Sequence, residues 1–430
     1  MNPQAGLSFE QAPPFALPLR FFLTAPLFLL AAAGLIAFSP ETLASRWTPQ
    51  ALALTHALTL GFLSMTMLGA LLQLLPVVAG TPLRAPRRVA WLSHIALTAG
   101  SLALMTGFLT AAPVAFGVGI VLLGSGLAVF LAAAAISLMR AVTSATVNGM
   151  RLAAISLGIT LLLGVALALQ RTGGRALPAV DAMLAAHVSF GLLGWVLLLV
   201  IGVAYQVVPM FQITPPYPPR LSRWLIGTAF VLLLLRAAVP LLPEPARTAA
   251  TLLTGIGLAA MILTFALVTL RLQSRRRRKL PDVTLDFWRV GMLSLIACVA
   301  VWLTAQFSPA WADSNRYPLL LGVLFIGGFA VSVVSGMLYK IVPFLAWFHL
   351  QAQLQARAGS IPTMRDMIAG RWARMQYRLH LAACALLVAA TGWPQQAWLA
   401  GGVLALSALL LEWNLLSATR RYVHHGGQFG

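Results

Sequence analysis

The sequence predicts an all-α polytopic membrane protein, with twelve transmembrane helices in three pseudo-symmetric four-helix units. Of the 430 residues, 60% are hydrophobic and only 9% are charged, and the mean hydropathy is +0.88. Soluble globular domains carry roughly 25% charged residues, so these values exclude an ordinary soluble enzyme. The repeat follows from a motif that recurs in every fourth predicted helix.

Twelve apolar runs are long enough to cross a bilayer, which takes about 20 residues of helix. The first run lacks the short apolar core and cleavage site of a signal peptide, so we expect a retained helix. Because the runs leave no room for a large soluble part, residues 1–430 are expected to form a single transmembrane domain. Bounded by Pro, Gly or Arg, the expected spans are 17–38, 51–79, 89–110, 112–138, 150–169, 182–210, 222–242, 248–270, 286–307, 317–347, 375–392 and 396–418.

The formal charge is +20, from 29 basic and 9 acidic residues. The positions of the basic residues indicate the role of this charge. They fall between apolar runs, mostly in alternate connections, and such loops stay on the cytoplasmic side. We therefore expect these loops and both termini in the cytoplasm, with lipid and not nucleic acid as the partner. The run Arg275 to Lys279 is interpreted as a topology anchor, with an anionic-lipid or nucleic-acid patch as the alternative. The basic connections are 84–88, 140–151, 220–223, 275–279 and 357–378.

A motif with four landmarks recurs at residues 61–76, 194–209 and 328–343, with offsets of 133 and 134 residues. Each copy has two glycines eight residues apart, then a polar residue, then a proline. Two small residues at this spacing lie on nearly one helix face and allow another helix to approach closely. A recurrence in every fourth helix predicts three parallel four-helix units around an axis along the membrane normal.

The polar landmarks of the repeat are Gln73, Gln206 and Lys340, which the motif places at one depth near the cytoplasmic face. Either they line a pathway for a solute, or their long side chains simply reach the interface. Glu412, near the cytoplasmic end of the last span, either pairs with an Arg or takes part in a proton relay. These alternatives stay open.

Two of the seven histidines, His56 and His187, lie inside the periplasmic ends of the second and sixth spans. They precede the aligned glycines of the repeat by five and seven residues, a difference of only ~3 Å along a helix. An imidazole in hydrocarbon is costly, and a neutral imidazole is the commonest metal ligand. We therefore expect both to face a shared cavity and to bind a cofactor.

Met183 precedes His187 by four residues, which places a thioether and an imidazole on one helix face. This pair suits copper(I), and an imidazole facing a macrocycle suits haem iron; packing is the alternative for Met183. Arg236, near the periplasmic end of the seventh span, either meets a haem propionate or reaches the interface.

The other polar candidates have simpler interpretations. His94, His349 and His380 are expected near cytoplasmic helix ends, where interfacial water or a backbone carbonyl satisfies an imidazole, and His424 and His425 belong to a polar tail. Cys298 and Cys384 lie in apolar segments and form no CxxC pair. No GxSxG, HExxH or phosphate-binding GxxxxGK[ST] motif is present.

The topology, His56, the segment His187-Val-Ser-Phe-Gly191 and the segment Tyr205-Gln-Val-Val-Pro209 resemble subunit I of haem-copper oxidases, with echoes of C-type oxidases and nitric oxide reductases. The resemblance implies that His56 ligates a haem and that His187 ligates copper. The resemblance fails at four further histidines of that family. Two of their positions are occupied by Leu321 and Val323 here, and the predicted span 222–242, where the family has the other two, contains no His. No oxygen or nitric oxide reductase turnover by a binuclear centre is therefore expected.

The pattern with only two of the family's histidines is similar to the NnrS-type branch of bacterial twelve-helix membrane proteins. The segments that carry this resemblance are Pro18-Leu-Arg20-Phe-Phe, and His56 followed by Gly61-Phe and Pro76. Membership implies a protein of the bacterial inner membrane that binds haem b, copper or both. It also implies a role in nitric oxide or nitrosative stress or in respiratory metal homeostasis. Two other functions remain open: a permease for a metal or small solute, and a cofactor-free partner of a respiratory complex.

Overall fold

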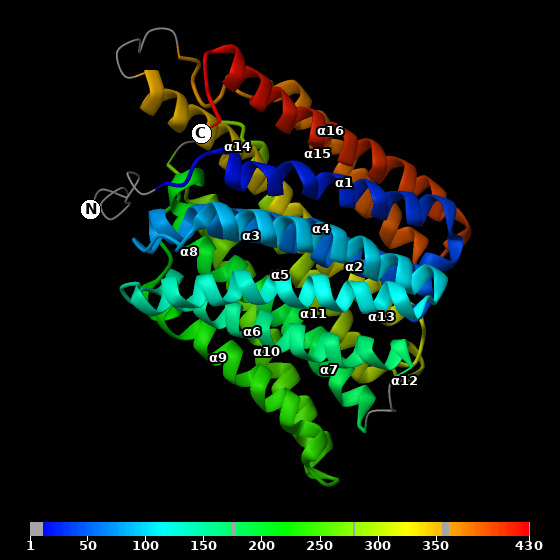
Figure 1. Cartoon of the computed structure of the whole chain (residues 1–430). Helices are drawn as coiled ribbons and strands as arrows, with labels where there is room; N and C mark the ends of the chain where they lie inside the picture. The colour runs from blue at the N-terminus through cyan, green and yellow to red at the C-terminus, as the bar shows by residue number, and fades with distance from the viewer. Residues whose placement is uncertain (1–11, 174–177, 278–279, 355–360, 430) are drawn as a thin grey trace. The chain divides into compact units, whose positions relative to one another are not determined.

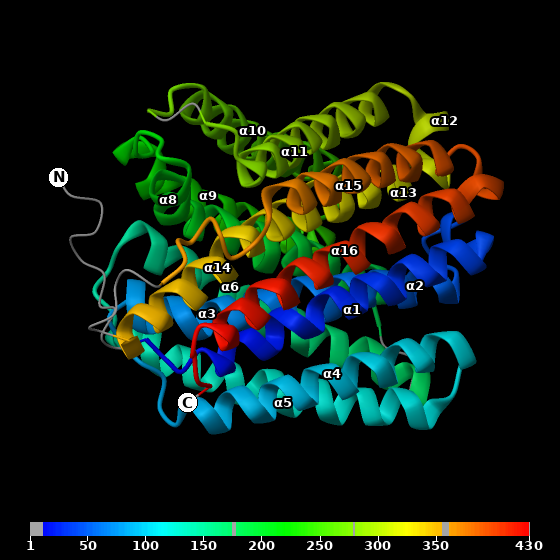
Figure 2. The same ribbon diagram turned by 90° about the horizontal axis from the view of Figure 1, so that it is seen from above.

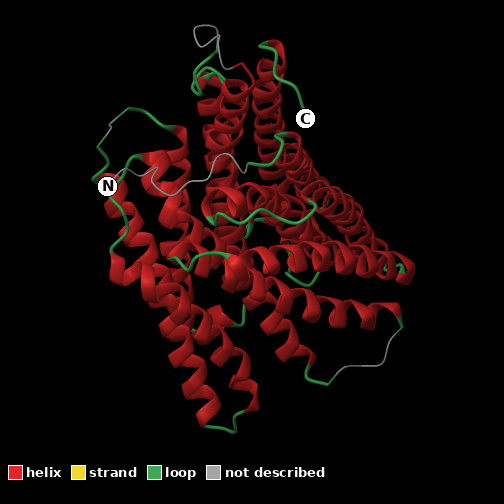
Figure 3. Ribbon diagram, turned by 60° about the vertical axis from the view of Figure 1, so that its left-hand side comes forward, coloured by secondary structure: helices red, strands yellow, loops and turns green. Residues whose placement is uncertain are grey.

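The computed structural model describes residues 12–173, 178–277, 280–354 and 361–429, and all regular structure in these ranges is helical (Figure 3). The chain is thus an all-α polytopic membrane protein, as the sequence predicts. Arg278, Lys279 and residues 357–360 of the predicted basic connections lie outside the described residues. Within the described ranges, eleven helices are long and apolar enough to span a membrane: Ala16–Phe38, Pro49–Val78, Pro86–Thr110, Pro113–Arg140, Ala145–Thr172, Val180–Gln212, Pro219–Leu241, Ala246–Ser274, Val283–Phe307, Arg316–Leu354 and Pro394–His424.

The predicted span 375–392 lies within helix α15 (Gly370–Ala390), which is not among these eleven. Its first half carries Arg371, Arg374 and Arg378, and this polarity lowers its mean hydropathy. The number of twelve spans therefore stays a prediction.

The helices divide into two compact units, each of which is described on its own. Unit 1 comprises Met1–Ala12 and Leu74–Lys279, and unit 2 comprises Pro13–Gln73 and Leu280–Gly430. The division falls inside helix α3 (Met65–Val78). The prediction of a single domain over residues 1–430 stays a prediction.

Unit 1 begins with a helical hairpin, α4 and α5, whose members lie side by side (Figure 2). Helix α6 packs on α5 and on the continuous helix formed by α7, the π-helical segment η5 and α8, and a second hairpin of α9 and α10 follows. Prolines open α4, α5 and α9, where a missing N–H costs nothing. The bounds are α4 Pro86–Thr110, α5 Pro113–Arg140, α6 Ala145–Leu169, η4 Gln170–Thr172, α7 Val180–Ser189, η5 Phe190–Leu197, α8 Leu198–Gln212, α9 Pro219–Ala238, η6 Val239–Leu241 and α10 Ala246–Ser274.

Unit 2 is built around α16, which packs along both α1 and α15 (Figure 1). Helix α1 also packs on the π-helical segment η3, and α11 packs on η7 and α14. The side chains of Thr48 and Asp282 cap α2 and α11. The bounds are α1 Ala16–Phe38, η2 Pro40–Leu43, α2 Pro49–His56, η3 Ala57–Ser64, α11 Val283–Phe307, α12 Pro309–Ala312, α13 Arg316–Gly322, η7 Val323–Val331, α14 Ser332–Leu354, η9 Pro394–Gln396 and α16 Ala397–His424.

Large apolar side chains are exposed in the middle of several spans, where an aqueous protein would place polar ones. Val121, Leu162 and Leu253 are exposed by 65%, 72% and 68%. Exposed apolar side chains on spans of this hydropathy are stable against hydrocarbon and unfavourable against water. The spans are therefore in contact with lipid.

Each of the three repeat-bearing helices contains a π-helical segment at the same place in the motif. These segments are η3, η5 and η7, which begin at Ala57, Phe190 and Val323, 133 residues apart each time. A π-helix is rare and occurs preferentially at functional sites. The local backbone thus changes in the same way at corresponding positions of the repeat.

The paired glycines of each motif pack against the long helix that precedes them in the chain, always within one unit. A Cβ on the second glycine would lie 2.7–2.8 Å from the nearest atom of that helix and 3.2–3.5 Å from one of its backbone carbonyl oxygens, so a side chain there requires the neighbouring atoms to shift. The three contacts join Gly69 to Pro18 of α1, Gly202 to Thr146 of α6, and Gly336 to Thr284 of α11. An arrangement of the three copies about a common axis stays a prediction.

Candidate functional site

His56 is the last residue of α2 and directly precedes the π-helical segment η3. Its Nδ1 lies 2.8 Å from the carbonyl oxygen of Leu52, one turn earlier in the same helix. A carbonyl oxygen only accepts hydrogen bonds, so Nδ1 carries the proton and Nε2 of the neutral imidazole keeps its lone pair. The half-buried ring is thus held in the tautomer that ligates metals through Nε2.

His187 lies in α7, three residues before the π-helical segment η5. Its Nδ1 is 3.0 Å from the carbonyl oxygen of Thr160 in α6, which fixes the same tautomer. Gly164 of α6 makes room for the ring, because a Cβ there would lie 2.9 Å from its Cε1. A hydrogen bond from one ring nitrogen to a carbonyl is the usual way in which a metal-ligating imidazole is oriented.

The donor set decides which cofactor these histidines fit. Within residues 12–173, 178–277, 280–354 and 361–429, no group of three or more His, Cys, Asp or Glu side chains is placed to hold a metal ion. Met183 is half-buried and lies on the same helix as His187; that His56 ligates haem and that His187 and Met183 contact copper stay predictions. Because His56 belongs to unit 2 and His187 to unit 1, their shared cavity stays a prediction.

Arg236 joins two helices of unit 1. Its Nη1 donates to the carbonyl oxygen of Thr251 at 2.6 Å and approaches Thr254 Oγ1 at 3.4 Å, both on α10. This contact ties the end of α9 to α10. The propionate contact proposed for Arg236 stays a prediction.

The three polar landmarks of the repeat have different surroundings. Lys340 Nζ lies 2.8 Å from Asp282 Oδ2, and the two side chains are 17% and 18% exposed, so the pair is largely withdrawn from solvent. Gln73 is buried, and its Oε1 has no hydrogen-bond partner among the described residues. Gln206 is half-buried. Their common role in a pathway stays a prediction.

Glu412 is half-buried in α16. Its Oε2 is buried without a hydrogen-bond partner in the described part of the chain. No ion pair joins it to an arginine within that part. The described structure thus contains no pair of Glu412 with an arginine, and the proton relay stays a prediction.

Unit 2 also contains a buried polar network that the sequence pattern does not predict. Tyr339 Oη of α14 donates to Gln376 Oε1 of α15 at 3.2 Å and accepts from Asn414 Nδ2 of α16 at 2.9 Å. Gln376 Nε2 donates to Ser407 Oγ of α16 at 2.9 Å. All four side chains are buried. The network contains one polar residue from each of two helices and two from the third, so no spacing in the sequence indicates it.

Replacing Tyr339 with phenylalanine is expected to lower the free energy of unfolding by about 1–3 kcal/mol, because it removes the hydroxyl that pairs with the buried Asn414 Nδ2 and Gln376 Oε1. Thermal unfolding of the detergent-solubilised protein would measure the change. Tyr377→Phe, a half-buried tyrosine of α15 outside this network, is the control. Equal unfolding temperatures for both variants would contradict the expectation.

His380 is the second polar feature, and its predicted place at a wet helix end is wrong. Helix α15 begins at Gly370, so His380 lies ten residues inside it and is only 1% exposed. Its Nε2 lies 2.7 Å from Ser332 Oγ and 3.5 Å from Cys384 Sγ, one turn later. The His-x-x-x-Cys spacing on one helix face was the available signal.

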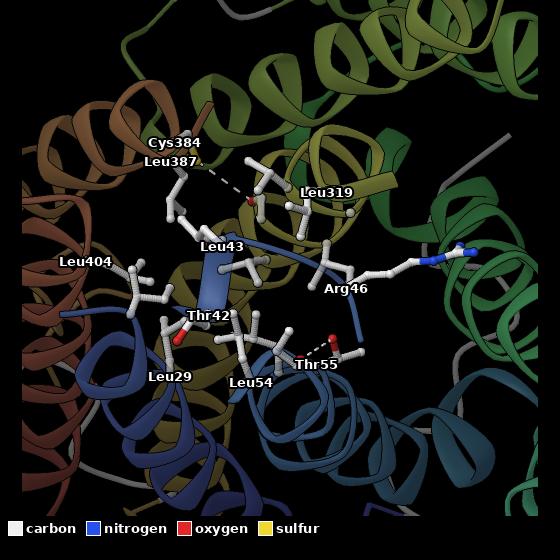
Figure 4. A pocket seen from close by; sticks show the side chains of 18 of the residues that line it. Leu29, Thr42, Leu43, Arg46, Leu54, Thr55, Leu319, Cys384, Leu387 and Leu404 are labelled. Carbon is white, nitrogen blue, oxygen red and sulfur yellow. Dashed lines mark hydrogen bonds between the residues drawn. The ribbon is translucent and has the colours of Figure 1, made fainter. Parts of the chain in front are cut away.

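His380 and Cys384 line a cavity of about 120 Å³ that lies wholly within unit 2. Figure 4 shows Cys384 and Leu387 of α15 on one side, with Leu29 of α1 and Leu54 and Thr55 of α2 on the opposite side. Most of the wall is aliphatic. The cavity therefore combines an apolar surface with a small polar corner.

No family model matches this chain, and neither does any curated protein. The resemblance to haem-copper oxidases and to the NnrS-type branch stays a prediction from the residues quoted above.

Proposed function

We propose that this chain is a haem- and/or copper-binding membrane protein related to subunit I of haem-copper oxidases and closest to the NnrS-type branch. It acts in the response to nitric oxide or nitrosative stress, or in respiratory metal homeostasis. One observation carries the proposal: His56 and His187 are both fixed by a backbone carbonyl on Nδ1, at 2.8 and 3.0 Å. This leaves Nε2 as the basic nitrogen of each neutral ring.

The roles follow from the residues. His56 would be the axial ligand of haem b, with Leu52 orienting it, and His187 with Met183 would contact copper, with Thr160 orienting the imidazole. Arg236 would approach a propionate. A bound haem supplies an iron that can change oxidation state and bind a diatomic ligand such as nitric oxide.

The proposal includes the architecture that the repeat predicts. Twelve spans form three four-helix units about a pseudo-threefold axis, in the bacterial inner membrane, with both termini in the cytoplasm. The recurrence of η3, η5 and η7 at intervals of 133 residues supports the repeat. The recurring contact of the second glycine with a carbonyl oxygen of the preceding helix supports it as well.

A permease for a metal or small solute is the second candidate, and Gln73 favours it. A buried amide oxygen without a partner among the described residues is expensive in a membrane helix, and a passing solute could satisfy it. A colourless, metal-free purified protein would select this candidate or a cofactor-free partner of a respiratory complex over the first.

The purified full chain is expected to show a Soret absorption band, and His56→Ala is expected to abolish or broaden it, because the replacement removes the axial ligand. His187→Ala and Met183→Ala are expected to lower copper content, measured by mass spectrometry of the metal, and to leave the Soret band in place. His425→Ala is the matched control, since His425 has the same Nδ1 contact with a carbonyl, that of Arg421 at 2.8 Å. Unchanged haem and copper in the His56→Ala, His187→Ala double variant would refute the site.

A further inference from the structure

Four arginines lie in the first halves of two helices of unit 2 that pack on each other, α11 and α15 (Figure 2). One ion pair crosses between the helices: Arg374 Nη1 of α15 lies 3.7 Å from Asp286 Oδ2 of α11. Arg371 precedes Arg374 by three residues, Arg378 follows it by four, and Arg289 follows Asp286 by three. Residues at these spacings are neighbours on one face of a helix. The ion pair therefore joins the four arginines, called the arginine cluster below, into one patch.

All four arginines of the cluster are accessible to a ligand. Arg289, Arg371 and Arg378 are exposed, and the side chain of Arg374 is 41% exposed. The charges of Arg289 and Arg374 both act on the hydroxyl of Tyr377, so arginines of the two helices lie near the same point. Among the described residues, the one ion pair of the cluster is that of Arg374. Four positive charges are thus set against one negative charge, and the patch attracts anions.

The cluster lies where charge gives way to hydrocarbon along both helices. Beyond Arg289 in α11 and Arg378 in α15, neither helix carries another Asp, Glu, Lys or Arg up to its end. About one turn further on, Leu293 and Leu381 are exposed by 57% and 44%. Beside the cluster, Trp372 is also exposed, and tryptophan is enriched at the interface between membrane and water. The patch therefore combines a cationic part at the level of lipid headgroups with an apolar part at the level of acyl chains.

We propose that the arginine cluster binds an anionic phospholipid, with its phosphate at Arg289 and Arg378 and an acyl chain along Leu293 and Leu381. A guanidinium can donate two parallel hydrogen bonds to phosphate oxygens, which favours arginine at phosphate sites. A zwitterionic lipid carries its own positive charge, which the excess positive charge of the cluster disfavours. Free phosphate makes no use of the exposed leucines. The site is independent of the proposed haem and copper.

Native mass spectrometry of the delipidated full chain in an uncharged detergent measures this binding. Dioleoylphosphatidylglycerol, which is anionic, is expected to half-saturate the site at an about tenfold lower concentration than dioleoylphosphatidylcholine, which has the same acyl chains and no net charge. Glycerol 3-phosphate, which has the phosphate without the acyl chains, is expected not to displace the bound lipid. Equal affinities for the two lipids, or displacement by glycerol 3-phosphate, would overturn the proposal.

Three variants separate this site from the general attraction of a basic protein for anionic lipid. Arg289→Gln, Arg378→Gln is expected to weaken binding of dioleoylphosphatidylglycerol by about tenfold, since it removes two of the positive charges. The control Arg171→Gln, Arg316→Gln removes two exposed arginines of other helices and is expected to change the binding less than about twofold. Asp286→Asn removes the negative charge within the cluster and is expected to strengthen the binding about threefold, a gain that a folding defect cannot produce. Equal losses in the two double variants, or no gain in Asp286→Asn, would contradict a site at the arginine cluster.

Discussion

Replacing Gly202 with valine is expected to cause the largest loss of folding stability. A Cβ on Gly202 would lie 2.8 Å from the Cα of Gly149, and a Cβ on Gly149 would lie 2.5 Å from the Cα of Gly202. The obstacle on each side is backbone, which cannot rotate away as a side chain can. Overpacking usually costs about 1–3 kcal/mol and occasionally more, and separating α6 from α8 places this substitution at about 3 kcal/mol or above.

The measurement is the yield and unfolding temperature of monodisperse protein after size-exclusion chromatography in detergent. Gly227→Val is the control, because Gly227 lies in α9 and a Cβ added there would have nothing within 4 Å of it. A Gly202→Val protein that unfolds at the wild-type temperature would show that α6 and α8 do not approach at this point.

Breaking the ion pair of Lys340 and Asp282 is expected to have the second-largest effect on stability. Lys340→Met leaves the Asp282 carboxylate, 18% exposed, without its counter-charge. Removing one partner of a buried pair costs about 3–5 kcal/mol, and the partial exposure of this pair lowers the expected cost to about 2–4 kcal/mol. The double variant Lys340→Met, Asp282→Asn should be closer to wild type, since asparagine still caps α11.

A double-mutant cycle by chemical or thermal unfolding measures this coupling. The control is Arg247→Met, which removes an ion pair with Glu244 whose side chains are 48% and 57% exposed, and its effect should stay below about 1 kcal/mol. Strictly additive single and double variants would contradict an interaction between Lys340 and Asp282.

The sequence predicts the helices well because each long apolar run has only one stable form in lipid, a helix that satisfies its own backbone. The start of α15 differs from the start of the predicted span. Arg371, Arg374 and Arg378 interrupt the apolar pattern, so hydropathy begins the span at 375, whereas the helix begins at Gly370. His380 therefore lies ten residues inside the helix, and it is buried because Ser332 and Phe287 pack against it.

The candidate sites were less predictable because their partners come from distant parts of the chain. Thr160 fixes His187 from another helix, and Asp282 reaches Lys340 across 58 positions. A periodic pattern identifies the face of one helix, but it carries no information about which carbonyl or carboxylate of a second helix lies opposite. The network of Tyr339, Gln376 and Asn414 could be recognised only once α14, α15 and α16 were packed together.

The π-helical segments also determine how far the two halves of each repeat-bearing helix are rotated relative to each other about the helix axis. A residue in a π-helix advances less around the axis than the 100° of an α-helix, so a helical wheel drawn straight through Pro49–Val78 misassigns the half after Ala57. Deleting one residue from η3 would turn the part that carries Gly69, relative to the part that carries His56, by less than the 100° that separates successive residues of an α-helix. The number of residues in the π-helical segment therefore determines which way the glycine-bearing half faces relative to the histidine-bearing half.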